Sequence, residues 1–234
     1  MRRTCLVTGA NRGIGLEFVR QLLERGEHVV ATCRQPGKAT ALNALAGEHP
    51  GHLHVLPLDV ADAKSRAGLL RELPLALRHD DRIYLLLNNA GVLHSGERFG
   101  HVEAGVLEDS LRTNAVAPFL LAQALAPLLA DGGTLANTSS QLGSIANTNR
   151  FGTPSYAISK AAQNMASALL AHALAERGIK VLALHPGWVQ TDMGGAQAQV
   201  TPENSVAGLL RVIDAATQAQ SGAFLDWRGN TLPW

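Results

Sequence analysis

The sequence predicts an α/β fold: a doubly wound, seven-stranded parallel sheet of Rossmann type, flanked by helices on both faces. Two observations predict it. Short runs of β-branched and leucine residues alternate with longer helical patterns, and the runs are apolar at successive positions, as in strands covered on both sides. The chain has 234 residues, 46% of them hydrophobic, and no linker or repeat interrupts the alternation. We therefore expect a single domain over residues 1–234.

Seven runs are expected to form the strands, the last of them short. They are TCLVTG (4–9), HVVATC (28–33), LHVLPL (53–58), IYLLLNNAG (83–91), GTLANTSS (133–140), KVLALHPG (180–187) and GAFLD (222–226). Helical patterns separate them, each long enough for a right-handed crossover between parallel strands. These patterns cover residues 13–25, 37–47, 62–78, 103–130, 154–177 and 203–217.

Composition excludes several classes of partner. The net charge is +1 and the charged residues are spread along the chain, so no surface for nucleic acid or an anionic membrane is expected. The first ten residues contain too short an apolar run for a signal peptide. The most apolar segment, 115–130, contains Pro118 and Pro127 and is too short to span a membrane. These features predict a cytoplasmic protein.

The cysteines and histidines do not predict a metal site. Cys5 and Cys33 fall on expected strands and lack the spacing of metal ligands or redox motifs, so we expect both in the core. His52 and His54 would point the same way from a strand, but no third ligand follows at a useful spacing. We expect solvent-facing histidines and no metal.

A glycine-rich turn follows the first run and leads into the first helix. Gly9, Gly13 and Gly15 would let the backbone turn tightly and approach a pyrophosphate at the helix N-terminus. Their spacing, Gly-x-x-x-Gly-x-Gly, differs from the general dinucleotide fingerprint Gly-x-Gly-x-x-Gly. The turn alone is compatible with phosphate binding or with packing only.

A tyrosine and a lysine stand four residues apart near the start of the helix at 154–177. Thr153 is a good N-cap residue and Pro154 suits the first helical position, so Tyr156 lies in the first turn and Lys160 in the second. The spacing places both side chains on one stripe. A cation so close to the positive end of the helix dipole is unfavourable unless something offsets it. Alone, the pair is weak evidence of a site and is more typical of a surface lysine beside a half-buried tyrosine.

Together the motifs resemble the single-domain short-chain dehydrogenases/reductases over nearly the whole chain. The matches occur in the family's order and spacing: Thr-Gly-x-x-x-Gly-Ile-Gly at 8–15, Asp59-Val60, Asn88-Asn89-Ala90-Gly91, Asn114, Ser140, Tyr156-x-x-x-Lys160 and Pro186-Gly187-x-x-x-Thr191. Within the family, the segments TCR, HPGWVQTDMGG and FLDWRGNTLPW are most similar to the C-factor and sniffer group of carbonyl reductases. One departure is Tyr84, where the family often has an acidic residue.

The resemblance implies a nicotinamide dinucleotide bound at the carboxyl ends of the strands. Asp59 and Val60 would hold the adenine, the backbone of 89–91 would run under it, and Val189 and Thr191 would hold the carboxamide. Asp59 is also suited to cap a helix starting at 61 or 62, and the two roles are compatible. The full expected set is Gly9, Asn11, Arg12, Gly13, Ile14, Gly15, Arg34, Asp59, Val60, Asn89, Ala90, Gly91, Tyr156, Lys160, Pro186, Gly187, Val189 and Thr191.

Three residues predict NADP(H) rather than NAD(H). An acidic residue at the end of the second strand would bind the ribose hydroxyls of NAD, but the neutral Cys33 stands there and Arg34 follows it. Arg12, at the start of the first helix, opposes the dipole, which suggests a nearby anion. A 2′-phosphate between the two arginines would satisfy both. The alternative is a solvated Arg34 and an Arg12 that only flanks the turn.

The expected chemistry is hydride transfer to a carbonyl group, whose oxygen then needs a proton. Tyr156 is the expected donor, with the ammonium of Lys160 lowering the pKa of its phenol. By the resemblance, Lys160 also binds the nicotinamide ribose, and Asn114 anchors a water that passes protons to it; the alternative for Asn114 is an exposed position in mid-helix. Ser140 would donate a hydrogen bond to the substrate oxygen. Ser139 is its rival, and the family's Ser-x-x-Gly pattern favours Ser140.

The sequence thus predicts an NADPH-dependent oxidoreductase that reduces a ketone, aldehyde or quinone, with a small-molecule carbonyl or alcohol as substrate. Leu142, Phe151, Trp188 and Met193 are expected to border an open pocket that suits bulky carbonyl compounds. A dinucleotide-binding signalling or sensor protein of C-factor type, with incidental catalysis, is the alternative. A sugar-nucleotide epimerase would need a longer C-terminal part. Small residues on the helices at 103–130 and 154–177, which pair in the family, predict a homodimer or homotetramer.

Overall fold

The computed structural model describes residues 3–77 and 82–234, and within them seven strands form one parallel sheet in the order β3-β2-β1-β4-β5-β6-β7. The strands are β1 (Thr4–Thr8), β2 (His28–Cys33), β3 (Leu53–Pro57), β4 (Ile83–Asn88), β5 (Leu129–Thr138), β6 (Lys180–His185) and β7 (Phe224–Asp226). The register is parallel throughout: Leu6 pairs with Val30 on one side and with Leu86 on the other. The doubly wound parallel sheet predicted from the sequence is confirmed.

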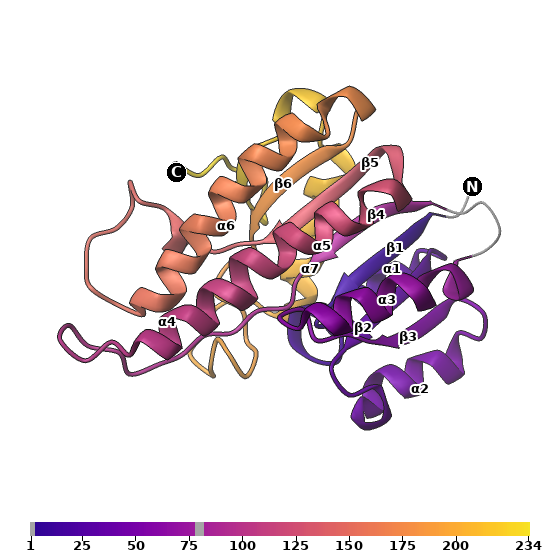
Figure 1. Ribbon diagram of the computed structural model, residues 1–234, viewed down its shortest axis with the longest axis horizontal. Helices are drawn as coiled ribbons and strands as arrows, with labels where there is room; N and C mark the ends of the chain where they lie inside the picture. Colours follow the sequence, from indigo (N-terminus) through magenta and orange to yellow (C-terminus); the bar gives the residue numbers. More distant parts are fainter. Residues whose placement is uncertain (1–2, 78–81) are drawn as a thin grey trace.

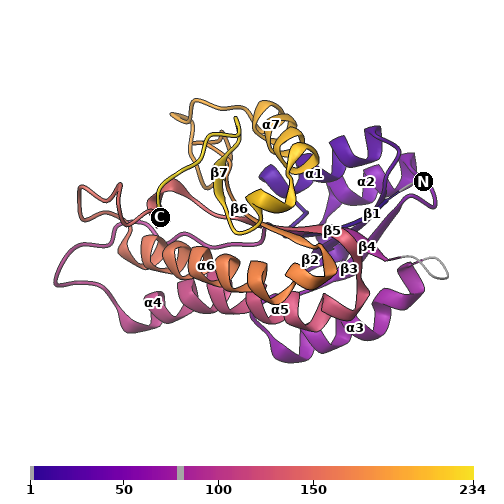
Figure 2. The same ribbon diagram turned by 90° about the horizontal axis from the view of Figure 1, so that it is seen from above.

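Helices cover both faces of the sheet (Figures 1 and 2). The helices are α1 (Gly13–Glu24), α2 (Thr40–Glu48), α3 (Ala63–Ala76), α4 (Ala104–Leu111), α5 (Ala117–Leu125), α6 (Pro154–Ala173) and α7 (Pro202–Ala215). α1, α2 and α7 pack on one face through an apolar cluster around Phe18 and Leu42. α3, α5 and α6 pack on the other through a cluster around Leu121 and Leu125. Strand side chains alternate between these two cores, which explains why the runs are apolar throughout.

The long helix expected at 103–130 is the largest deviation from the sequence prediction. It consists of α4, a π-helical turn (Arg112–Val116), α5 and a short 3₁₀ turn (Ala126–Leu128), and β5 then begins at Leu129. Pro118 has no N–H to donate to the carbonyl four residues earlier, and the Ala117 N–H bonds Arg112 O, five residues back. Pro127 stands in the final turn and ends the helix.

The other helices agree with the prediction to within a few residues. The expected end of the third helix, residue 78, lies outside the described part of the chain. α3 begins after Asp62, whose carboxylate accepts the Ser65 N–H at 2.6 Å. Asp62, and not Asp59, is therefore the capping residue of this helix.

Candidate active site

The chain reverses its winding direction between β1 and β4, and loops at the carboxyl ends of the strands surround a cleft there. The cleft has a volume of about 1280 Å³. Nearly all of the expected site residues line it: Gly9, Asn11, Arg12, Gly13, Ile14, Arg34, Asp59, Val60, Asn89, Ala90, Gly91, Ser140, Tyr156, Lys160, Pro186, Gly187, Val189 and Thr191. Gly15 and Asn114 do not line it. Both lie behind the residues that line the cleft.

The glycine-rich turn shapes the floor of the cleft. Gly9 and Gly13 have φ angles of 63° and 54°, which side chains disfavour. A Cβ at Gly15 would lie 2.2 Å from the Gly9 carbonyl oxygen, so Gly15 lets α1 close onto the turn. Of the two alternatives for the glycine-rich turn, phosphate binding and packing, the packing alternative describes Gly15. The first turn of α1 carries no acidic side chain and no side-chain cap, so its N–H groups suit a bound anion.

Thr8 and Asn89 tie the end of β1 to the end of β4. The Thr8 hydroxyl oxygen accepts the N–H groups of Asn89 (3.0 Å) and Ala90 (3.1 Å), and the Asn89 side chain donates to Thr8 O at 3.1 Å. Tyr84, at the position where an acidic residue was expected, instead lies under the Arg3 guanidinium at 4.6 Å. Sequence reasoning did not assign a role to Thr8, although it begins the glycine motif.

Arg12, which is expected to pair with a ligand phosphate, has a partner within the protein. Arg12 donates to the Asp192 carboxylate at 2.7 Å, across the cleft from the segment that follows β6. An anion of the protein itself therefore offsets this cation. Cys33 is buried at the end of β2, Arg34 is exposed, and Lys38 lines the same part of the cleft. Lys38 was missed, although it stands only four residues after Arg34.

Tyr156 and Lys160 lie side by side under the cleft, 9% and 3% exposed. The Lys160 ammonium donates to Thr138 O at 2.7 Å and to Gln163 Oε1 at 3.0 Å. Burial lowers the pKa of Lys160 to about 7. Burial also raises the pKa of Tyr156 to about 12, and the hydrogen bond with Ser140 only partly opposes this. Desolvation is therefore the largest influence on this phenol, and the expected lowering of its pKa by Lys160 stays a prediction.

The two candidate serines are in different environments. Ser139 is 1% exposed, and its hydroxyl donates to Asn164 Oδ1 at 2.5 Å. Both serines line the cleft, but Ser140 is 8% exposed, and its oxygen accepts the Leu142 N–H at 3.2 Å. The Ser140 hydroxyl hydrogen is not used by that bond. A Cβ at Gly143 would lie 2.7 Å from the Lys160 carbonyl carbon, so the glycine of the Ser-x-x-Gly pattern permits close contact with α6.

Asn114 is fully buried in the π-helical turn, so the exposed alternative is wrong. Its side-chain oxygen accepts the Val92 N–H at 2.8 Å, and its amide donates to Val92 O at 2.8 Å and to Ser159 Oγ at 2.9 Å. Asn114 thus joins the loop after β4 to α6. Gly91 lies between this residue and the lysine: a Cβ there would be 3.1 Å from Asn114 Oδ1 and 3.8 Å from Lys160 Nζ.

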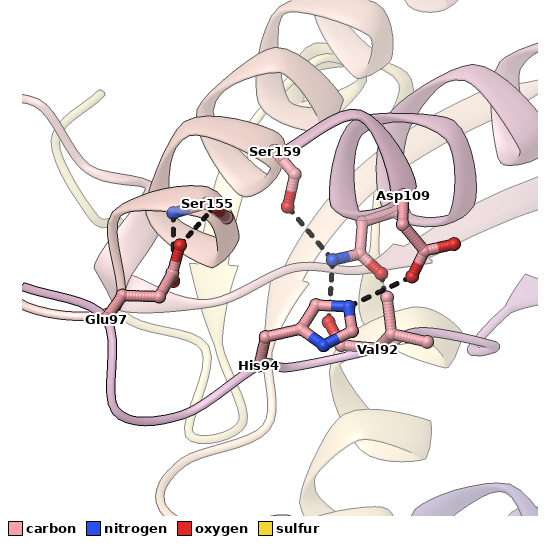
Figure 3. A network of polar contacts seen from close by, with 7 residues as sticks. Val92, His94, Glu97, Asp109, Ser155 and Ser159 are labelled. Carbon is pink, nitrogen blue, oxygen red and sulfur yellow. Dashed lines mark hydrogen bonds and ion pairs between the residues drawn. The ribbon is translucent and has the colours of Figure 1, made fainter. Parts of the chain in front are cut away.

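The start of α6 differs in detail from the expectation. Thr153 does precede the helix, but it has a left-handed conformation (φ 41°) and its side chain makes no capping bond. The Glu97 carboxylate, from the loop after β4, accepts the Ser155 N–H at 3.3 Å and the Ser155 hydroxyl (Figure 3). In the same loop, His94 pairs with Asp109 at 2.9 Å. No local pattern around residue 154 indicated Glu97.

The outer part of the cleft is mixed in character. Leu142, Trp188 and Met193 line it as expected, but Phe151 instead packs edge to face on Phe99, with ring centroids 5.6 Å apart. Sequence reasoning missed several further lining residues: Leu93, Asp109, Thr113, Arg150 and His185. Burial lowers the pKa of His185 to about 4, although Asp226 raises it. A neutral imidazole therefore borders the cleft at neutral pH.

Two further findings concern the described residues alone. Among residues 3–77 and 82–234, no three His, Cys, Asp or Glu side chains are placed to hold a metal ion. No helix in that part of the chain has the length and apolar character needed to cross a membrane.

Comparison with known proteins agrees with the site geometry. Residues 3–201 match the short chain dehydrogenase family. The chain is 34% identical over 235 residues, 99% of each protein, to 1-hydroxy-2-glutathionyl-2-methyl-3-butene dehydrogenase from Rhodococcus sp. (strain AD45). It is 39% identical over 152 residues to the C-signal protein of Myxococcus xanthus, covering 64% of this chain and 92% of that protein.

Solved structures give the same result. The NADPH-bound carbonyl reductase from chicken fatty liver superposes with a TM-score of 0.94 at 38% identity, and the carbonyl reductase Sniffer of D. melanogaster with a TM-score of 0.95 at 33% identity. Both cover 100% of this chain and 100% of their own. The sequence motifs, the fold, the family match and these structures therefore agree that the chain is an oxidoreductase belonging to the short-chain dehydrogenase/reductase family.

Proposed function

We propose that this protein is an NADPH-dependent carbonyl reductase in which Tyr156 donates a proton to the substrate oxygen. One observation carries the proposal: the phenol of Tyr156 and the hydroxyl of Ser140 meet in the cleft, next to the buried ammonium of Lys160. The phenol is protonated at neutral pH, which is the form a proton donor requires. Ser140 has a hydroxyl hydrogen to offer to the same oxygen.

The cleft fits a nicotinamide dinucleotide phosphate. The N–H groups at the start of α1 suit a pyrophosphate, and Asp59 at the end of β3 suits an adenine amino group. Arg34 and Lys38 supply positive charge beside the neutral Cys33, which suits a 2′-phosphate. Bound NADPH would supply the hydride. Gly187, Val189 and Thr191 would hold the carboxamide, and Lys160 the ribose.

Leu142, Trp188 and Met193 border the substrate side of the cleft, so we propose bulky aldehydes, ketones or quinones as substrates. The test is a panel of such compounds, followed by nicotinamide absorbance with NADPH and with NADH. We expect turnover with NADPH for several compounds and little with NADH. No turnover of any carbonyl compound by folded protein that binds NADPH would contradict the proposal.

A dinucleotide-binding signalling or sensor protein, with incidental catalysis, is the second candidate, and similarity to the C-signal protein favours it. The variant Tyr156→Phe distinguishes the two candidates. If the protein acts as a reductase, the variant loses its function in the cell together with its turnover. If the protein acts as a sensor, the variant keeps that function as long as it binds the dinucleotide.

The proposal includes assembly and location. The described residues contribute to a single sheet, so we treat the chain as one domain. Apolar side chains stand exposed at the end of the π-helical turn and along α5 and α6: Val116, Leu120, Ile158, Met165 and Leu169. We propose that these surfaces pair in a homodimer or homotetramer.

The thiols of Cys5 and Cys33 are free and buried, which fits the reducing cytoplasm.

A further inference from the structure

The helix that carries Tyr156 begins without a cap of its own. Thr153 is the one non-glycine residue with a positive φ among residues 3–77 and 82–234, and its side chain makes no bond to the helix. The first turn of α6 contains no acidic residue. The N–H groups of a first turn need acceptors from outside the helix, so a partner elsewhere in the chain is required.

Glu97 is that partner. Its two carboxylate oxygens accept both donors of Ser155, one the main-chain N–H at 3.3 Å and the other the hydroxyl (Figure 3). Ser155 is fully buried, so the carboxylate, and not bulk solvent, satisfies its donors in the folded protein. A negative charge at the positive end of α6 is also favourable. The contact joins residues 58 positions apart, so it depends on the tertiary structure.

The loop that carries Glu97 is itself held in place. Asn114 bonds both main-chain groups of Val92, each at 2.8 Å, and His94 pairs with Asp109 on α4 at 2.9 Å (Figure 3). Beyond Glu97, Phe99 packs on Phe151. The carboxylate is therefore presented from a loop attached to α4, to the π-helical turn and to the segment before α6.

We propose that Glu97 is a positioning residue for Tyr156: by binding Ser155 it fixes the first turn of α6 and thereby the place of the phenol in the cleft. The inference rests on Tyr156 being the proton donor of the proposed reaction. Tyr156 is the third residue of α6 and lies in the turn that Glu97 holds, whereas Lys160 lies in the next turn and has its own bonds to Thr138 and Gln163. Loss of Glu97 should therefore displace the phenol and leave the lysine in place.

The test compares Glu97→Ala, Glu97→Gln and Ser155→Ala with Glu108→Ala, a control at an exposed carboxylate on α4. We expect Glu97→Ala to lower kcat about 10- to 100-fold, since small displacements of a reacting group have effects of this size. KM for NADPH should stay within about twofold, because Lys160 and the glycine turn are untouched. The solvent deuterium isotope effect on kcat should increase, since proton transfer becomes more limiting; a purely structural role would not produce this.

Glu97→Gln keeps an acceptor for Ser155, so its kcat should be close to that of the wild type. Ser155→Ala should lower kcat relative to the wild type. Glu97→Ala combined with Ser155→Ala should be no worse than Glu97→Ala alone, because the hydroxyl bond that Ser155→Ala removes is already lost in Glu97→Ala. If Glu97→Ala does not fold, Glu97→Gln and Ser155→Ala carry the test. The inference would be overturned if Glu97→Ala had the kcat and the isotope effect of the wild type. If only Ser155→Ala folds, wild-type values in that variant would overturn it.

Tyr156→Phe measured alongside separates this inference from the proposed function. If Tyr156→Phe retains turnover, the proposed proton donor is wrong, whatever Glu97 does. If Tyr156→Phe is inactive while Glu97→Ala and Ser155→Ala behave as wild type, only the positioning role is wrong.

Discussion

The ammonium nitrogen of Lys160 lies 5.6 Å from the centroid of the Tyr156 ring, and both groups are buried under the same cleft. This distance is within the range of a cation–π contact. The lysine bonds Thr138 and Gln163, while the phenol is adjacent to Ser140. Burial shifts both pKa values toward the neutral forms, to about 7 for the lysine and about 12 for the tyrosine. A neutral phenol suits the reductive direction, in which Tyr156 donates.

Replacing Tyr156 with Phe removes the hydroxyl and changes little volume. Carbonyl reduction should fall by about 10²- to 10⁴-fold, as for the loss of an acid-base group, while NADPH still binds. Steady-state rates and NADPH fluorescence titration measure the two effects. Folded Tyr156→Phe with retained turnover would remove Tyr156 from the mechanism.

The lysine makes stability depend on pH. Burial lowers its pKa from 10.5 to about 7, so between these values the unfolded chain binds a proton that the folded chain has released. The free energy of unfolding should therefore rise with pH from about 7 to 10.5, by up to about 1.4 kcal/mol per pH unit. Below about pH 7 the lysine is protonated in both states and its contribution stays constant. Lys160→Met should lack the rise, and it should also impair NADPH binding and rate.

Urea unfolding at several pH values between about 6.5 and 9.5 measures this difference. Staying below about pH 9.5 avoids the opposite effect of Tyr156, whose raised pKa lowers stability at alkaline pH. Parallel curves for wild type and Lys160→Met across the range would mean that Lys160 keeps its charge in the folded protein.

Cofactor preference should depend on Arg34 more than on Arg12. A hydrogen bond to a charged group is worth about 1.5 to 3 kcal/mol, so Arg34→Ala should raise KM for NADPH roughly ten- to a hundredfold and leave KM for NADH nearly unchanged. Arg12→Ala is the matched comparison and should have a smaller effect, because Arg12 is already paired with Asp192. Equal losses with both cofactors would indicate that Arg34 supports the fold. Preference of the wild type for NADH would overturn the NADPH assignment.

Replacing Gly15 or Gly47 with alanine should change the stability of the protein in opposite directions. Gly15→Ala places a Cβ 2.2 Å from the Gly9 carbonyl oxygen, so it should destabilise the turn and abolish dinucleotide binding. Gly47, on α2, has no atom within 4 Å of the position of a Cβ. Gly47→Ala should raise stability by about 0.5 to 1 kcal/mol, because alanine favours helix. Thermal unfolding of both variants checks the pair, and a stable, dinucleotide-binding Gly15→Ala would contradict the close packing.

Assembly should depend on the exposed apolar surface of α6. Leu169, which is 56% exposed, is a suitable site for a charge, and Leu75, 86% exposed on α3, is the control. We expect a dimer or tetramer by light scattering at micromolar concentration, dissociated by Leu169→Glu and unaffected by Leu75→Glu. Monomeric wild-type protein would refute the predicted assembly.

The sequence by itself determined the parallel sheet, the alternation of its strands and helices and many of the residues around the cleft, because apolar runs, glycine turns and the Tyr-x-x-x-Lys spacing each lie within a few consecutive residues. Only the tertiary structure decided which distant groups meet. Asp192 pairs with Arg12 from 180 residues away, Glu97 replaces the cap expected from Thr153, and Asn164 binds the Ser139 hydroxyl. The raised pKa of Tyr156 has the same origin: desolvation depends on everything that packs around the phenol, and no local pattern reports it.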